Sequence, residues 1–268
     1  MALFPTNNYF VFNKEIRHVK KFVPSENEGG IYEVLRVTRG IPLFFEDHMT
    51  RFYNSAAIAG KTIRFAPEEI KNLIYELIQT NEENEGNILL SCKTNLKAFF
   101  IPYRYPSEIQ YREGVNCRIL KAERENPNAK VFQTEVRRKA NEMIENNGIF
   151  EVLLEDHLGG ITEGSRSNVF FVKGDVLITP PFNKVLPGIT RQKTMLCAKE
   201  LQLEIFEKDV FRKDLPGFDS VFITGTSPKI LPVKTIESFS YNTENKILRS
   251  LMKSFDLMID RYTKKISD

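Results

Sequence analysis

Hydrophobic and polar positions in the first hundred residues alternate between the spacing of strands and the spacing of helices. Gly60 ends one helical segment, as glycine does where a helix closes in the left-handed conformation. Pro67 begins the next, with acidic residues in its first turn where they suit the helix dipole. The predicted elements are a strand at 31–38, helices at 46–59 and 67–82, and paired strands at 88–92 and 98–103. This order predicts a small α/β unit.

A polar segment at 104–113 and a turn-rich one at 125–128 separate this unit from a longer second half. The elements predicted there are helices at 133–147, after 188 and at 243–267, and strands at 149–155, 169–173, 176–179 and 218–224. We therefore expect a mixed α/β (α+β) chain with a small N-terminal domain at 1–107 and a larger C-terminal domain at 114–268.

Composition and charge narrow the classes of function. The 268 residues carry 38 basic and 35 acidic side chains, and the two signs are mixed along the chain. Proteins that bind nucleic acids or membrane surfaces concentrate basic residues, so we expect neither partner. No apolar run is long enough to span a bilayer and no secretory leader pattern is visible, which predicts a cytoplasmic protein. The 3 cysteines and 3 histidines stand far apart, which predicts neither a disulfide framework nor a metal site.

Three segments of the second half hold unusual polar residues. Residues 162–168 (Thr-Glu-Gly-Ser-Arg-Ser-Asn) place a carboxylate among small polar groups in a predicted turn between strands. Residues 186–191 (Leu-Pro-Gly-Ile-Thr-Arg) begin a helix, whose first backbone amides lack internal partners and attract anions. Residues 224–227 (Thr-Gly-Thr-Ser) follow a buried strand with more hydroxyl and amide groups. Each segment alone is also what an ordinary turn or a capped helix contains.

In this order, the three segments resemble the class IV (fold type IV) aminotransferases, which use pyridoxal 5'-phosphate (PLP). Further matches are Gly-Ile-Tyr-Glu-Val at 30–34, His-Met-Thr-Arg at 48–51 and Pro-Val at 232–233. The resemblance covers about residues 29 to 233, most of the chain. It implies a two-domain fold with PLP in the cleft between the domains, and a homodimer. The family includes branched-chain and D-amino-acid aminotransferases as well as aminodeoxychorismate lyase.

The resemblance assigns the central catalytic roles to two residues. The family's cofactor lysine lies about 33 residues before the glutamate of the Thr-Glu-Gly triplet, which identifies Lys130 as the residue that forms the Schiff base with PLP. A lysine so placed supplies a positioned amine for proton transfer. Glu163 is expected to face the pyridine nitrogen and keep it protonated, so that the ring accepts electrons when a substrate bond to Cα breaks.

The other family positions belong to cofactor and substrate binding. Arg51 matches the phosphate-binding arginine, whose planar fork suits phosphate oxygens. His48, one helical turn earlier, is predicted to be a structural hydrogen-bonding residue. The remaining cofactor-binding residues predicted are Ser167, Asn168, Ile189, Thr190 and Thr226, and the predicted substrate-binding residues are Tyr32, Thr226 and Ser227.

Departures from the family pattern bear on the substrate. Residues 25–30 replace a glycine-rich turn that is usual before Tyr32, and residues 131–133 lack an asparagine often found after the lysine. Where D-amino-acid aminotransferases carry an arginine and a histidine for the substrate carboxylate, this chain has Ile101 and Tyr103. These two residues disfavour a D-amino-acid substrate.

Three functions fit these motifs. The first is transfer of an amino group between an L-amino acid, of branched-chain type, and a 2-oxo acid. The second is a lyase reaction that releases pyruvate and 4-aminobenzoate from 4-amino-4-deoxychorismate. The third is PLP binding without transaminase activity. The first two share every cofactor residue, so only the substrate pocket distinguishes them.

Overall fold

The computed structural model describes residues 4–24, 30–132 and 134–267; most of the 25–30 departure and Gln133 therefore lie outside the described residues. Contacts divide the chain into two compact units. Unit 1 comprises Met1–Arg104, Ala129–Phe132 and Ile259–Asp268, and unit 2 comprises Tyr105–Asn128 and Gln133–Met258. These units differ from the contiguous ranges expected, 1–107 and 114–268, because the segment around Lys130 and the end of the chain are grouped with unit 1. The predicted mixed α/β fold is confirmed.

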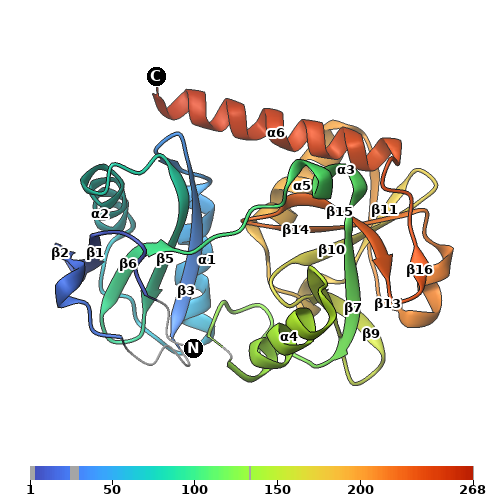
Figure 1. Ribbon diagram of the computed structural model, residues 1–268, viewed down its shortest axis with the longest axis horizontal. Helices are drawn as coiled ribbons and strands as arrows, with labels where there is room; N and C mark the ends of the chain where they lie inside the picture. Colours follow the sequence, from blue (N-terminus) through green and yellow to red (C-terminus); the bar gives the residue numbers. More distant parts are fainter. Residues whose placement is uncertain (1–3, 25–29, 133, 268) are drawn as a thin grey trace. The chain divides into compact units, whose positions relative to one another are not determined.

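Unit 1 is built on a six-stranded antiparallel sheet of order β2-β1-β6-β5-β3-β4, drawn in Figure 1. Its strands are β1 (Tyr9–Phe12), β2 (Glu15–His18), β3 (Ile31–Thr38), β4 (Ile41–Pro42), β5 (Glu85–Cys92) and β6 (Leu96–Ile101). Its helices are α1 (Phe45–Ile58) and α2 (Pro67–Thr80), with a 3-10 turn η1 (Val19–Lys21). Both helices contribute apolar residues to one core on a single face of the sheet.

Side chains of strand β3 alternate between that core and the opposite face of the sheet. Successive side chains of a strand point to opposite faces. Ile31 and Leu35 belong to the core that includes the helices, whereas Tyr32 belongs to a second cluster with Phe10, Leu89 and Phe99. Glu33 has the same parity as Ile31 and Leu35, so its carboxylate lies on the face that α1 covers.

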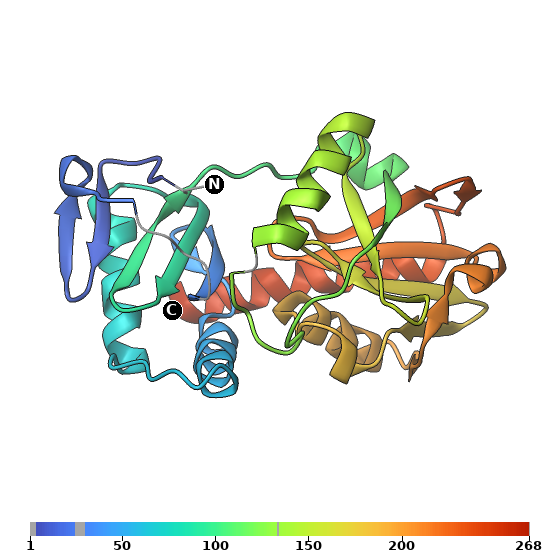
Figure 2. The same ribbon diagram turned by 90° about the horizontal axis from the view of Figure 1, so that it is seen from below.

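Unit 2 is built on a ten-stranded sheet of order β12-β11-β10-β14-β15-β7-β8-β9-β13, with β16 paired to β15. Its strands are β7 (Val115–Lys121), β8 (Glu151–Glu155), β9 (Gly160–Gly164), β10 (Asn168–Lys173), β11 (Val176–Thr179), β12 (Glu204–Glu207), β13 (Val210–Phe211), β14 (Ser220–Gly225), β15 (Lys229–Ile236) and β16 (Phe239–Ser240). The pairs β11/β12, β15/β7 and β7/β8 are parallel and the others are antiparallel. Figure 2 gives a second view.

The helices of unit 2 lie between its strands along the chain and after the last strand. They are α3 (Glu108–Glu113), α4 (Thr134–Asn147), α5 (Ile189–Glu200) and α6 (Lys246–Ser267), whose last residues are grouped with unit 1, together with the 3-10 helices η2 (Phe182–Lys184) and η3 (Arg212–Gly217). Antiparallel pairing of β10 with β14 places Asn168 opposite Thr224. Among the described residues, no helix is long and apolar enough to cross a membrane.

Most predicted elements are confirmed, and two are corrected. Residues 162–164 lie in the buried strand β9 instead of a turn, and the turn is confined to 165–167. Strand β9 is bounded by glycines and pairs with β8 on one side and β13 on the other. Its sequence has no alternation of apolar and polar residues, so the pattern did not predict a strand. The polar segment 104–113 contains α3, which begins at a capping box formed by Ser107 and Gln110.

Candidate active site

In unit 1, a buried glutamate holds two side chains of α1. The Arg51 Nε donates to Glu33 Oε1 at 2.8 Å and Arg51 Nη2 donates to Oε2 at 2.6 Å. His48 Nδ1 lies 2.7 Å from the same Oε2. His48 and Arg51 are three residues apart on α1, so both face β3. The predicted structural role of His48 is consistent with this contact.

The charge state of this triad follows from burial and pairing. Burial alone would raise the pKa of Glu33, but the charge of Arg51 and hydrogen bonds from Arg51 and His48 outweigh it and lower the pKa to about 2. Burial lowers the pKa of His48 from 6.5, although Glu33 opposes the shift. A neutral imidazole facing a carboxylate donates its proton, so His48 carries its hydrogen on Nδ1. The triad thus consists of one anion, one cation and one neutral donor.

Lys130 is fixed to the first residues of β3 and to α1. Its backbone N–H donates to Ser55 Oγ at 3.0 Å, and its carbonyl accepts from the Tyr32 N–H at 3.1 Å. The Phe132 N–H donates to the Gly30 carbonyl at 3.0 Å, which extends the pairing. Three backbone groups therefore hold the segment around Lys130 before α4 begins.

The Lys130 side chain lies against an aromatic wall. Its Nζ is 4.8 Å from the centre of the Tyr32 ring. Tyr32 in turn stacks on Phe132, with ring centres 4.0 Å apart and planes inclined by 24°. The charges of Arg51 and Lys130 both act to lower the pKa of His48, which places the two cations near the same imidazole. Unit 1 thus brings Lys130, Arg51 and Tyr32 together.

In unit 2, the Glu163 carboxylate is buried on β9 and held from three sides. Arg124 Nη1 lies 3.1 Å from Oε1. The Leu186 N–H donates to Oε2 at 3.1 Å, and Asn168 Nδ2 donates to the same oxygen at 3.4 Å. Glu163 is 2% exposed. A buried carboxylate with a cationic partner and two neutral donors is arranged to remain an anion.

Asn168 connects the three motifs of the second half. Its Nδ2 also donates to the Leu186 carbonyl at 2.9 Å, which joins the start of β10 to the loop before α5. A Cβ on Gly188 would overlap Asn168 Oδ1, so the close approach requires glycine although the backbone φ of −60° does not. Thr224 lies opposite Asn168, and its buried Oγ1 has no hydrogen-bond partner among the described residues.

The helix α5 begins beside this junction. Ile189 and Thr190 are its first residues, both are buried, and Gly188 provides the N-cap. The unpaired amides of a helix start bind phosphate and other anions. Thr226 and Ser227 follow β14 and are half-buried. Glu163, Asn168, the first turn of α5 and the loop after β14 therefore meet within unit 2, as the motif order predicted.

A second buried glutamate, Glu151 on β8, supports the 165–167 turn. Its carboxylate accepts hydrogen bonds from Ser165 Oγ at 2.6 Å, Ser167 Oγ at 2.9 Å and the Arg166 N–H at 3.2 Å. The Ser167 hydroxyl is thus engaged with Glu151, and its role toward a cofactor stays a prediction. Gly164 is required here because a Cβ would overlap Ser167 Oγ. The only sequence signal for Glu151 is an acid within an apolar strand.

These residues suit PLP. In unit 2, the amides at the start of α5 and the unpartnered Thr224 hydroxyl suit an anionic group such as a phosphate, and the buried Glu163 carboxylate suits a protonated ring nitrogen. In unit 1, Arg51 has a guanidinium of the kind that binds phosphates. Lys130 offers the amine for covalent attachment. In the described part of the chain, no cluster of three or more His, Cys, Asp or Glu side chains is arranged to hold a metal ion. Cys92, Cys117 and Cys197 are buried free thiols.

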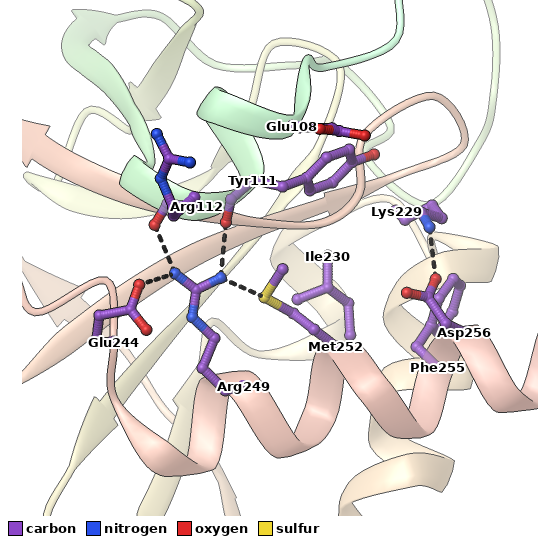
Figure 3. A pocket seen from close by; sticks show the side chains of 10 residues that line it. All are labelled: Glu108, Tyr111, Arg112, Lys229, Ile230, Glu244, Arg249, Met252, Phe255 and Asp256. Atoms are coloured by element: carbon purple, nitrogen blue, oxygen red, sulfur yellow. Dashed lines mark hydrogen bonds and ion pairs between the residues drawn. The ribbon is translucent and has the colours of Figure 1, made fainter.

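A cavity of about 520 Å³ lies elsewhere in unit 2, where α3, β15 and α6 meet. Figure 3 shows that two of its cationic side chains are engaged: Arg249 donates to the Tyr111 carbonyl at 2.7 Å and pairs with Glu244, and Lys229 pairs with Asp256. None of the residues predicted for the active site lines this cavity.

The comparison with known proteins agrees with these motifs. The family model for amino-transferase class IV matches residues 30–236. D-alanine aminotransferase of Bacillus licheniformis is 30% identical over 78% of this chain and 79% of its own. A Methanocaldococcus jannaschii protein assigned as a branched-chain-amino-acid aminotransferase is 27% identical over 89% and 90%. The Escherichia coli branched-chain amino acid aminotransferase has the same fold, with a TM-score of 0.85 over 95% of both chains at 21% identity. The chain therefore belongs to the class IV aminotransferases, a family whose cofactor is PLP, and it is a transaminase.

Proposed function

We propose that this enzyme moves an amino group between an L-amino acid with an apolar, branched-chain-like side chain and a 2-oxo acid. The observation that carries the proposal is the aromatic wall beside Lys130. The Nζ of Lys130 lies over the Tyr32 ring, and Tyr32 stacks on Phe132. An uncharged wall next to the reacting amine favours an apolar substrate side chain over a charged one. Ile101 and Tyr103, at the positions where D-amino-acid aminotransferases carry an arginine and a histidine for the substrate carboxylate, favour an L-amino acid over a D-amino acid.

The residues divide the chemistry as follows. Lys130 would hold PLP covalently when the cofactor is bound. Its amine, when free, would accept the proton from the Cα of the amino donor and, in the second half of the reaction, would donate a proton to the Cα of the acceptor. PLP, when bound, supplies an electron sink. Glu163 holds a proton on the ring nitrogen because its buried carboxylate stays anionic. Arg51, the amides of Ile189 and Thr190, and Thr226 bind the phosphate, with Asn168 and Ser167 maintaining the loops that present them.

The proposed substrate-binding residues come from both units. Tyr32 contacts the substrate side chain, and the backbone amides and hydroxyls of Thr226 and Ser227 bind the α-carboxylate. The loop after β14 offers these groups at a half-buried position, so they are accessible to a small anion. We also propose that the enzyme is a cytoplasmic homodimer. Sedimentation equilibrium at several protein concentrations tests the dimer.

A substrate panel tests the proposed reaction. The purified enzyme with PLP is incubated with L-leucine, L-valine, L-glutamate, L-alanine and D-alanine as separate donors, each with 2-oxoglutarate or pyruvate as acceptor. We expect the branched-chain L-amino acids to be converted fastest. Fastest conversion of D-alanine contradicts the proposed substrate and favours the activity named for the Bacillus licheniformis relative.

A second arm of the experiment tests the lyase alternative. The enzyme is incubated with 4-amino-4-deoxychorismate, and pyruvate and 4-aminobenzoate are measured. We expect no pyruvate release above that of the Lys130→Ala variant. Release of pyruvate without amino transfer to any 2-oxo acid identifies the lyase reaction instead.

A further inference from the structure

Arg124 lies beside the most chemically important carboxylate of the chain, although no motif includes it. It belongs to the segment between β7 and Lys130, and its Nη1 is 3.1 Å from Glu163 Oε1. The two side chains are 13% and 3% exposed. A buried ion pair of this kind differs from the surface pairs of the molecule, because water does not screen it.

Burial disfavours the ionised form of the Glu163 carboxylate, and the positive charge of Arg124 counteracts this effect. Removing a carboxylate from water favours its neutral, protonated form. A protonated Glu163 would no longer hold a proton on the ring nitrogen by charge. The Leu186 N–H and Asn168 Nδ2 stabilise the anion as neutral donors, at 3.1 and 3.4 Å. Arg124 adds a full positive charge, which favours the ionised carboxylate more strongly than a neutral donor does.

Other charged groups around β9 do not replace Arg124. Glu151 and Glu155 on the neighbouring β8, and Asp156 after them, are buried acidic residues. Glu151 is bonded to Ser165 and Ser167, and Asp156 faces Lys184 at 3.5 Å. Nearby carboxylates would by themselves make ionisation of Glu163 harder, so a cation at its Oε1 matters more.

We propose that Arg124 is a positioning residue of the transaminase reaction, which acts through Glu163 by keeping that carboxylate ionised and turned toward its ring partner. This inference rests on the proposed role of Glu163. Arg124 contacts Oε1 through Nη1 of its planar guanidinium, so a lysine would restore the charge but not the planar hydrogen-bonding geometry. Arg124 is not one of the residues that contact PLP or substrate in the proposed mechanism.

The first experiment needs no cofactor. Glutamate labelled with ¹³C at the side-chain carboxyl carbon is incorporated into the protein without PLP, and the Glu163 signal is assigned by its loss in Glu163→Gln. We expect the titration of that signal in Arg124→Gln to move up by at least about one pH unit, since an opposite charge at this distance shifts a carboxylate by one to three units. Arg124→Lys should lie between the wild type and Arg124→Gln.

The second experiment uses the holoenzyme. The acid limb of the pH profile for kcat/KM with the best amino donor should move to higher pH in Arg124→Gln and be largely restored in Arg124→Lys. In a Glu163→Gln background, Arg124→Gln should produce no further shift, because the titrating group is gone. Arg138→Gln, which removes an exposed pair with Glu142, is the control and should leave both readouts unchanged.

The outcomes separate this inference from the proposed function. An unchanged Glu163 titration in both Arg124 variants overturns the role of Arg124, whatever the enzyme catalyses. An equal shift of the acid limb with and without Glu163 also overturns it, because Arg124 would then act on another group. If no amino donor reacts, the proposed function fails while the carboxylate titration still decides the inference. Circular dichroism establishes folding, and Arg124→Lys provides the test if Arg124→Gln does not fold.

Discussion

Arg51 and Glu33 form a two-point ion pair in the core of unit 1, with N···O distances of 2.8 and 2.6 Å. Neither side chain has appreciable contact with solvent. The position of Glu33 follows from strand parity, since it shares the helix-covered face of β3 with Ile31 and Leu35. The pair keeps the Arg51 guanidinium in one orientation.

Replacing Glu33 should destabilise the fold strongly. In Glu33→Gln the Arg51 cation remains buried without its anion, and loss of one partner of a buried pair costs about 3–5 kcal/mol. Urea unfolding followed by circular dichroism measures the change in the free energy of unfolding. Glu15→Gln, which removes the exposed pair with Arg17, should cost no more than about 1 kcal/mol. Equal losses in the two variants contradict the importance of the buried pair.

Acid should weaken the same cluster in two stages. The pKa of His48 is lowered from 6.5 in the folded protein, so the unfolded chain binds its proton first and stability falls as pH drops below about 6.5. The pKa of Glu33 is lowered from 4.5 to about 2, so its contribution is present above pH 4.5 and is lost as pH falls toward about 2. Urea midpoints between pH 7 and 5 should fall less steeply in His48→Gln than in wild type. His157→Gln, at an exposed site, should keep the wild-type slope.

The sequence predicted elements best where local signals agree with tertiary structure. Gly60 follows the end of α1 and Pro67 begins α2, and the apolar residues of both helices contribute to the unit 1 core. Glu163 was predicted in a turn because its strand is flanked by glycines and has no apolar alternation. Within unit 2 the three polar segments lie together, and within unit 1 Lys130 lies near Arg51 and Tyr32, although the placement of PLP on them stays a prediction.

The partners of the site residues were not predictable from the sequence. Arg124 lies 39 residues from Glu163, and Ser55 lies 75 residues from Lys130. Such pairs arise only when strands and helices pack, and nothing in the local pattern near Arg124 or Ser55 indicates a partner. The role of Glu151 was equally unpredictable. From sequence alone, an acidic residue in an apolar strand is either exposed to solvent or buried with hydrogen-bond partners, and only the structure distinguishes the two.

The contact between Gly188 and Asn168 should make Gly188 intolerant of a methyl group. A Cβ there overlaps Asn168 Oδ1, and overpacking of this kind costs about 1–3 kcal/mol. Because Asn168 joins Leu186 and Glu163, we expect Gly188→Ala to lower PLP affinity by about tenfold or more, measured by fluorescence titration. Gly217→Ala is the matched control, since its Cβ would meet only the Lys173 Nζ at 3.8 Å. Unchanged PLP affinity in Gly188→Ala contradicts this account of the loop.

Lys130 should be the residue to which PLP is covalently attached. Borohydride reduction of the PLP-loaded enzyme followed by peptide mapping should place the pyridoxyl group on Lys130, and Lys130→Ala should give no labelled peptide and no visible absorbance from a covalent cofactor. Lys121 and Lys139 are nearby lysines in the sequence, and Lys121→Ala should leave labelling unchanged. A pyridoxyl group on Lys121 or Lys139 shows that the assignment by motif spacing is wrong.

Glu163→Gln tests the centre of the proposed mechanism. The substitution keeps the size of the side chain and its hydrogen-bonding head but removes the charge that holds a proton on the ring nitrogen. Proton removal from the substrate Cα should then slow while PLP still binds, because Arg51 and the first turn of α5 are unchanged. A lost charge contact of about 3–4 kcal/mol corresponds to a slowing of the half-reaction by about two to three orders of magnitude. Stopped-flow absorbance with an amino donor measures this rate, with Glu142→Gln on the exposed face of α4 as the control. If Glu163→Gln reacts at the wild-type rate, Glu163 serves only to join β9 to Leu186 and Asn168, and the ring proton must be held by another group.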